Sequence, residues 1–303
     1  HGGGASGEQL KAFQPQVETA WDSGELPPCV LVTPTTGEMS WYHEHDDGSE
    51  RWESFLIEAV LPHARKSLPV RPDRDGTFVG GISMGGFGSL KLALRHPQLF
   101  RAVAALEPAI QPALRADQIG ARNDYYFAGG PADLLPETRN PEVWEQHNPA
   151  SIARLNAAAI RASQIAIFLE CGTRDVLNLH DGAEFLHRVL WELDIEHEYR
   201  LHRGADHVGP SLAWRNLQAL EWLLAVDEID SAEGTTLTED ERAWIEWLRG
   251  GFEGDPPGAP LDAHSVAAIE MLRTQFGPMR EALARKDPAA ARHFGKLPPP
   301  SSE

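Results

Sequence analysis

Short apolar runs alternate with amphipathic helical patterns from about residue 28 to residue 226. The runs predict buried strands at 29–32, 77–81, 102–106, 165–169 and 197–201. Strands that alternate with helices are typical of a parallel sheet covered by helices. The pattern therefore predicts an α/β fold over most of the chain.

The helical patterns are recognised by apolar residues that recur at i, i+3, i+4 and i+7. One begins near Trp52, and a second follows residue 83 and ends before Pro97. Two more follow the strands predicted at 165–169 and 197–201. Their apolar positions are Leu186, Val189, Leu190 and Leu193 in one, and Leu217, Leu220 and Leu224 in the other.

An irregular stretch at about 111–160 separates the third and fourth predicted strands. It is rich in proline, asparagine and aromatic residues, and long loops inside a compact domain are usually lids or binding segments. Its aromatic residues either line a substrate cleft or pack a lid against the core. They are Tyr125, Tyr126, Phe127 and Trp144.

The pattern changes after about residue 227. A capping box at 238–241 predicts a short helix, and a Gly/Pro-rich linker at 250–260 leads to a second helical stretch at 265–285. The tail at 298–303 is predicted to be disordered. We therefore divide the chain into an α/β domain at 1–226 and a helical appendage at 227–303, in which we find no candidate chemistry.

Charge narrows the classes of partner. Of the 303 residues, 27 are basic and 45 acidic, giving a net charge of −18, which argues against binding to nucleic acid or to an anionic membrane surface. No apolar run approaches the roughly 18 residues of a membrane span. Two cysteines, Cys29 and Cys171, make no disulfide framework in a chain of this length, so we expect buried free thiols. Oligomeric state stays open.

The sequence Gly-Ile-Ser-Met-Gly at 81–85 matches G-x-S-x-G and lies between a predicted strand and a predicted helix. In this context the serine occupies a sharp, strained turn that exposes its hydroxyl at the helix N-terminus. Ser83 is therefore the candidate nucleophile.

Acyl transfer also needs hydrogen-bond donors for the developing oxyanion. The backbone N–H of Met84, the residue after the candidate nucleophile, is one. His-Gly-Gly-Gly at 1–4 matches the glycine-rich motif that supplies the second. Gly3 is our choice, with Gly4 close behind. The alternative is that 1–4 is only a flexible terminus.

A serine nucleophile needs a histidine base and an acid, expected in the order Ser, acid, His. Asp175 follows the fourth predicted strand and His207 follows the fifth, so both fall at the edge of the sheet where Ser83 emerges. The histidine would take the serine proton, and the carboxylate would fix its tautomer. Asp175 could instead be only a helix cap, and Glu107, at the end of the third strand, is a rival acid.

With these residues in place, 1–226 resembles the esterase D-like branch of the α/β hydrolases. The similar segments are GEMSWY at 37–42, RWESFL at 51–56, GISMGG at 81–86 and HPQLF at 96–100. That branch includes S-formylglutathione hydrolases, feruloyl and acetyl-xylan esterases, enterochelin esterases and mycolyltransferases. The resemblance implies an α/β-hydrolase fold and a triad of Ser83, Asp175 and His207.

The resemblance further implies that Gly3 and Met84 form the oxyanion hole and that Trp41 and Tyr42 lie near the substrate cleft. It departs after His207, where Val-Gly-Pro at 208–210 replaces the aromatic residue common in the family. This difference bears on the shape of the acyl pocket. The resemblance does not extend to 227–303.

We therefore expect a serine esterase that acts on a small-molecule or carbohydrate-linked ester, without cofactor or metal. His-Glu-His-Asp-Asp at 43–47 lacks the H-E-x-x-H spacing and is interpreted as a solvated loop. Two alternatives stay open: an acyltransferase that uses the same acyl-enzyme, and a non-catalytic binding protein on the same fold.

In this fold a strand runs directly into the loop that corresponds to 1–4, between the strands predicted at 29–32 and 77–81. No such strand precedes His1. We accordingly expect the α/β domain to be incomplete on its N-terminal side, and to fold poorly because buried backbone groups would lack partners. Localisation stays open, with the cytoplasm slightly favoured over secretion.

Overall fold

The computed structural model describes residues 1–44, 48, 50–123 and 141–231, together with residues 243, 247, 257 and 258. Contacts divide the chain into two units, His1–Val226 and Asp227–Glu303. The features predicted at 238–241, 265–285 and 298–303, and the aromatic residues Tyr125, Tyr126 and Phe127, lie outside the described residues. The elements of the sheet and its covering helices belong to the first unit, in which helix α9 also begins.

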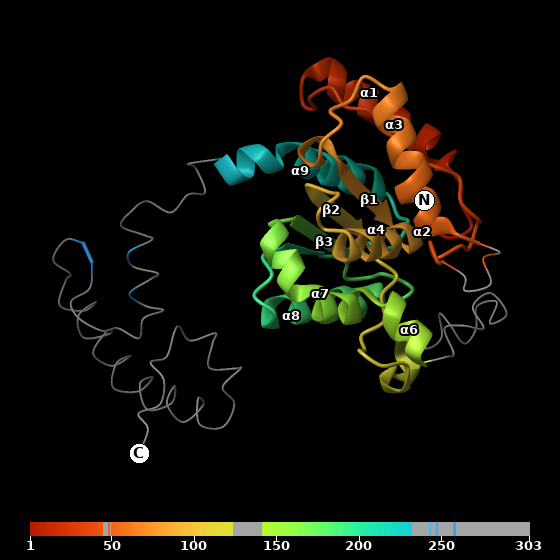
Figure 1. Ribbon diagram of the computed structural model, residues 1–303, viewed down its shortest axis with the longest axis vertical. Helices are drawn as coiled ribbons and strands as arrows, with labels where there is room; N and C mark the ends of the chain where they lie inside the picture. The colour runs from red at the N-terminus through yellow and green to blue at the C-terminus, as the bar shows by residue number, and fades with distance from the viewer. Residues whose placement is uncertain are drawn as a thin grey trace. The chain divides into compact units, whose positions relative to one another are not determined.

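Four parallel strands form the sheet in the order β1-β2-β3-β4 (Figure 1). They are β1 (Phe78–Ile82), β2 (Ala102–Leu106), β3 (Ala166–Gly172) and β4 (Glu198–His202). The alternation of strands and helices thus predicted four of the five strands within a residue or two at their starts. Ile82 pairs with Leu106, and Leu106 pairs with Glu170, so β1 and β2 end in register at one edge, and β3 continues two residues further.

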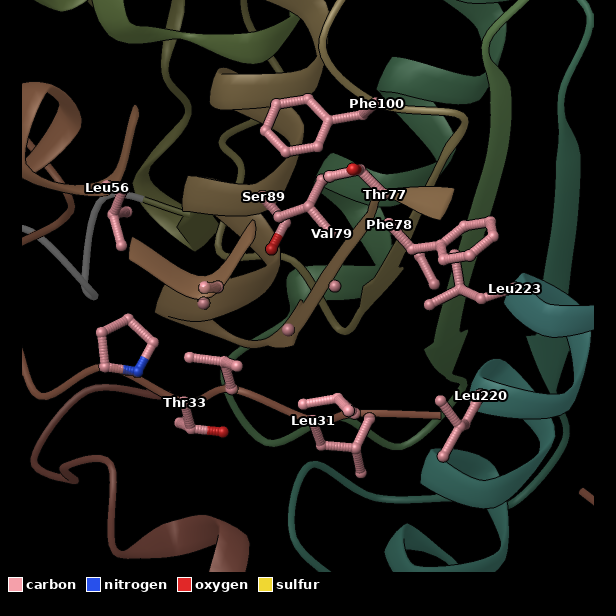
Figure 2. A pocket seen from close by; sticks show the side chains of 18 of the residues that line it. Leu31, Thr33, Leu56, Thr77, Phe78, Val79, Ser89, Phe100, Leu220 and Leu223 are labelled. Carbon is pink, nitrogen blue, oxygen red and sulfur yellow. The ribbon is translucent and has the colours of Figure 1, made fainter. Parts of the chain in front are cut away.

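The strand predicted at 29–32 is not formed, which corrects the prediction. Among the described residues no strand lies beside this segment, and an apolar run without a pairing partner cannot complete a ladder. A cavity of about 450 Å³ separates it from β1. Figure 2 shows Leu31 and Thr33 on one side of this cavity and Thr77, Phe78 and Val79 on the other.

The two faces of the sheet are covered by different helices (Figure 1). Helices α4 (Met84–Arg95), α7 (Pro149–Ser163) and α8 (Leu179–Glu192) bury one face, where they pack on residues such as Val103 and Leu169. Helix α9 (Leu212–Ser231) buries the other, and its Trp222 ring lies 5.2 Å from the Phe168 ring. This alternation of strand side chains between two layers is what the period of two in a strand requires.

Helix α1 (Gln9–Ser23) is absent from the sequence predictions. Its largely polar sequence buries only Val17 and Ala20, which pack with Leu220 of α9. The helix predicted near Trp52 is a continuous run of α2 (Trp52–Ser54), a π-helical segment η1 (Phe55–Val60) and α3 (Leu61–Ser67). The described residues of this unit also include the short 3₁₀ turns η2 (Arg74–Gly76) and η3 (Ala116–Gln118).

The stretch at 111–160 is less irregular than its composition suggested. Helix α6 (Pro141–His147) and most of α7 fall within it. The Asn148 side chain caps α7 by accepting from the Ala150 N–H, and Pro149 takes the first helical position, as the preferences of helix starts require. Trp144 is buried, and its Nε1 donates to Gln111 Oε1 at 3.1 Å, so this aromatic residue packs against the core.

A buried ionic cluster joins α2 to α4. Lys91 of α4 is fully buried, and its Nζ lies 3.3 Å from Glu53 Oε2. The same carboxylate meets Arg95 at 2.6 Å and His96 at 2.9 Å. Burial lowers the pKa of Lys91 to about 8. Burial opposes ionisation of Glu53, but its cationic neighbours outweigh this and lower its pKa to about 2.

Cys29 and Cys171 are free, as expected. Cys171 is buried as expected, whereas Cys29 is only half-buried, which corrects the expectation for that thiol. In the part of the chain that the structure describes, no helix combines the length and the apolar character needed to cross a bilayer.

Candidate active site

Ser83 stands at the turn between β1 and α4, where the G-x-S-x-G pattern predicts it. Its backbone has φ 58° and ψ −119°, a region that side chains with a Cβ rarely occupy. The turn is fixed to the end of β2, because the Ser83 N–H donates to the Leu106 carbonyl at 2.9 Å. A Cβ on Gly81 would lie 2.6 Å from the Gly85 carbonyl carbon, so the chain can turn this tightly only with glycine there.

The structure brings His207 and Asp175 to Ser83. His207 Nε2 lies 3.1 Å from Ser83 Oγ, and His207 Nδ1 lies 2.8 Å from Asp175 Oδ2. Asp175 follows β3 and His207 follows β4, so both come from the edge where β1 delivers the serine. Three residues far apart in the sequence thus form one chain of hydrogen bonds.

Asp175 is fixed by its own loop. Its Oδ1 accepts from the Leu177 N–H at 2.7 Å and from the Leu179 N–H at 3.4 Å. The carboxylate therefore caps the start of α8 with one oxygen and meets His207 with the other. The alternative that Asp175 is a helix cap describes only half of its contacts.

Glu107 also reaches His207. It follows β2 with a left-handed φ of 43°, and its side chain is fully buried. Glu107 Oε2 lies 3.0 Å from His207 Nδ1, while its Oε1 accepts from Arg215 of α9. The residue weighed in the sequence as a rival to Asp175 is therefore its neighbour at the same imidazole nitrogen.

The two carboxylates determine the electrostatics of His207. Burial alone would lower the pKa of this imidazole, but the hydrogen bond to Asp175, the close contact with Glu107 and the charges of both carboxylates raise it to about 9. Burial raises the pKa of Glu170, which contacts the same Arg215, to about 7 despite that cation.

The two residues chosen as oxyanion donors lie close together. Met84 is the first residue of α4, and the first N–H groups of a helix have no partner within the helix. A Cβ on Gly3 would lie 4.0 Å from Met84 Cβ, and a Cβ on Gly2 would lie 3.7 Å from Ser83 Cβ. The Gly4 N–H is occupied, since it donates to the Glu38 carbonyl at 2.8 Å. The glycine loop therefore adjoins the candidate nucleophile, and Gly3 stays the better choice over Gly4.

Trp41 and Tyr42, the residues expected to lie near the substrate cleft, are buried. Their exposed fractions are 3% and 6%. The Trp41 ring packs edge-on against Phe87 at 5.5 Å, and the Tyr42 hydroxyl donates to the His1 carbonyl at 2.8 Å. These two aromatic residues are buried because they pack against apolar residues of α4 such as Phe87.

The expectation of a solvated loop at 43–47 needs a correction at its first residue. His43 is buried, with its ring 4.2 Å from that of His147, while 45–47 lie outside the described residues. Glu44 is half-buried and pairs with Arg51 at 3.0 Å.

Three acidic or histidine side chains that lie close together are a possible metal site. Among the described residues, the one group of this kind is Glu107, Asp175 and His207. Their nitrogen–oxygen distances of 2.8 and 3.0 Å are those of direct hydrogen bonds.

Comparison with known proteins agrees with this arrangement of strands and loops. Residues 4–227 match the profile of the family described as "Putative esterase". An acetyl esterase of Caldicellulosiruptor saccharolyticus is 32% identical over 81 residues, which are 27% of this chain and 30% of that protein. The chain thus matches less than a third of that relative's length.

Two further similarities cover more of the chain. A diacylglycerol acyltransferase/mycolyltransferase of Mycobacterium tuberculosis is 26% identical over 195 residues, 59% of this chain and 55% of that protein. The solved structure of a ferulic acid esterase superposes with a TM-score of 0.60 at 20% identity, over 75% of this chain and 83% of the other. At this identity the likeness shows the fold, which is that of the α/β hydrolases.

Proposed function

The chain belongs to the esterase family that its residues 4–227 match, and from this premise we propose that it hydrolyses a carboxylic ester through an acyl-enzyme on Ser83. The proposal assigns the chemistry to residues 1–226 and treats 227–303 as an appendage. The observation that carries it is the hydrogen-bond chain from Ser83 Oγ through His207 to Asp175, with steps of 3.1 and 2.8 Å.

In the first half-reaction His207 Nε2 takes the proton of the Ser83 hydroxyl as Oγ attacks the ester carbonyl carbon. The carbonyl electron pair moves onto oxygen, where the N–H groups of Met84 and Gly3 would stabilise the oxyanion. When the intermediate collapses, the alkoxide leaves with the proton from Nε2. The acyl group is then bound to Ser83 as a new ester.

In the second half-reaction His207 takes a proton from water, and the hydroxide oxygen attacks the acyl carbon. Collapse releases the carboxylic acid and returns the proton to Ser83 Oγ. Throughout, Asp175 accepts from Nδ1–H, which keeps Nε2 free for the serine and stabilises the imidazolium.

The surface beside these residues supports a substrate with an apolar portion. Val176 follows Asp175 and is 66% exposed, and Val208 follows His207 and is 71% exposed. Exposed valines next to buried polar groups suit contact with the acyl or alcohol carbon chain.

Acyl transfer is the second candidate. It uses the same acyl-enzyme with an alcohol in place of water, and the similarity to a mycolyltransferase over 59% of the chain favours keeping it.

The test is labelling by a fluorophosphonate probe, followed by hydrolysis of short-chain nitrophenyl, feruloyl, acetyl-xylan and S-formylglutathione substrates. We expect the chain to be labelled at Ser83 and Ser83→Ala to lose both labelling and turnover. Ser89→Ala is the matched control, since Ser89 is a buried serine on the same helix, and it should label like the wild type.

A wild-type protein that is folded but neither labelled nor active on any of these esters would refute the proposal. Turnover that depends on an added sugar or other alcohol, with little hydrolysis, would favour the acyltransferase.

A further inference from the structure

Two carboxylates compete for a single proton at His207. Asp175 Oδ2 lies 2.8 Å from Nδ1, and Glu107 Oε2 lies 3.0 Å from the same atom. Nδ1 carries at most one hydrogen, so it can make one good hydrogen bond at a time. The hydrogen-bond geometry is met with Asp175.

Glu107 is held in this position from several sides. Its N–H donates to the Glu170 carbonyl at 2.8 Å, and its Oε1 accepts from Arg215. Its Oε2 is buried and has no hydrogen-bond partner among the described residues. A buried carboxylate oxygen without a partner is costly, so its place against His207 needs an explanation beyond packing.

Arg215 balances the negative charge behind the imidazole. Its guanidinium contacts Glu107 and lies 3.0 Å from Glu170, and Nη2 donates to the Asp206 carbonyl at 2.7 Å. One cation therefore faces two carboxylates of the strand ends.

The other polar groups around His207 come from the neighbouring loops and β3. Asp206 Oδ1 accepts from the His207 N–H at 2.6 Å, and the Cys171 thiol lies 4.0 Å from Asp175 Oδ2. Ser83 faces the opposite ring nitrogen. Among the described residues no cation contacts the ring, so the negative charges of Asp175 and Glu107 act together at Nδ1.

We propose that Glu107 is a second positioning carboxylate, which shares His207 Nδ1 with Asp175 and stabilises the imidazolium formed during acyl transfer. The catalytic consequence rests on the proposed function. The positioning itself is a property of the buried cluster, and it can be measured without turnover.

The test compares Glu107→Gln with Glu170→Gln by two measurements. Gln removes the charge but keeps the shape, and Glu170 is the matched control because it contacts the same Arg215 but has no described contact with His207. We expect the E107Q imidazole, followed by NMR titration, to titrate about one pH unit lower than the wild type. The acid limb of kcat/KM should move by the same amount, and E170Q should move both by less than about a third of that shift.

A second comparison isolates the sharing of Nδ1. Asp175→Ala leaves Glu107 as the remaining acceptor, so the double variant D175A/E107Q should lose at least a further tenfold in kcat relative to D175A. If Glu107 were only structural, the double variant would match D175A once corrected for the folded fraction.

Two outcomes overturn the proposal: a His207 titration unchanged in E107Q, or an equal shift in E170Q. If E107Q does not fold, Glu107→Asp decides, because it keeps the charge beside Arg215 but withdraws the carboxylate by one methylene group. The imidazole pKa should again fall. A wild type without esterase activity would refute the proposed function, while the NMR comparison would still decide the role of Glu107.

Discussion

The backbones of Gly81 and Gly85 pack closely against each other on the two sides of the turn that carries Ser83. A Cβ on Gly81 would stand 2.6 Å from both the carbonyl carbon and the carbonyl oxygen of Gly85. Because both neighbours are backbone atoms, no side chain can move aside. The end of β1 and the start of α4 can approach this closely only without a Cβ.

Gly81→Ala should therefore widen the turn and displace Ser83. We expect a loss of about 1–3 kcal/mol in unfolding free energy and fluorophosphonate labelling at least about tenfold slower. Chemical denaturation and labelling kinetics measure the two effects. Gly120→Ala is the control, since a Cβ there meets nothing within 4 Å. A G81A variant that labels at the wild-type rate would contradict the close approach.

The pH dependence of turnover follows from the pKa of His207. The base must be neutral to accept the serine proton, and the pKa of about 9 means that most of the imidazole is protonated at neutral pH. We expect kcat/KM to rise about tenfold per pH unit below pH 8 and to level off above about 9. Initial rates on a nitrophenyl ester measure this, with the S83A rate subtracted for alkaline hydrolysis. A flat profile from pH 6.5 to 9 would contradict it.

The raised pKa of His207 also affects the stability of the fold, and its stabilising contribution decreases as the pH rises. Because the pKa of His207 in the folded chain is raised above its ordinary value near 6.5, the protonated form stabilises the fold. That contribution is fully present below about pH 6.5 and is lost as the pH rises through about 9. The difference in unfolding free energy between wild type and His207→Gln should shrink over this range. Urea denaturation at pH 6 and pH 9.5 measures it, and a constant difference would contradict the assignment.

Glu53→Gln should leave Lys91 as a fully buried cation without its carboxylate. Removing one partner from a buried ion pair costs about 3–5 kcal/mol, and Arg95 and His96 lose the same contact. Glu8→Gln is the control, because the Glu8–Lys11 pair is largely exposed and should matter by less than about 1 kcal/mol. Equal effects of the two variants on the denaturation midpoint would refute the importance of the buried cluster.

The four strands that form were predictable because each lies between helical patterns, which is the alternation expected of a parallel sheet. Strands β1, β2 and β3 are rich in apolar residues, β4 alternates polar with apolar residues, and each strand has a parallel neighbour. The run at 29–32 has the same local character, yet no strand among the described residues pairs with it, since pairing depends on what lies beside a segment and not on its own residues. Helix α1 was not predicted because its sequence is largely polar and it buries only two small apolar residues, Val17 and Ala20.

The residues of the candidate site likewise fall into those that could be predicted from the sequence and those that could not. Ser83, Asp175 and His207 could be found because each follows a strand, and the ends of parallel strands meet at one edge. The sharing of His207 Nδ1 by Glu107 could not, because it depends on side-chain direction and on Arg215, whose place in a helix 108 residues further on carries no local signal. The burial of Trp41 was likewise a matter of tertiary packing.

The backbone hydrogen bonds that tie Ser83 to Leu106 and Glu107 to Glu170 bind the reactive edge into the ladder itself. A loop-borne site can open locally while its scaffold stays intact, but this one cannot separate its nucleophile without breaking central strand pairs. The amide protons of Ser83 and Glu107 should therefore exchange with solvent as slowly as the amide protons that pair the strands. On heating, Ser83 and Glu107 should then lose their positions only together with the pairing of the strands.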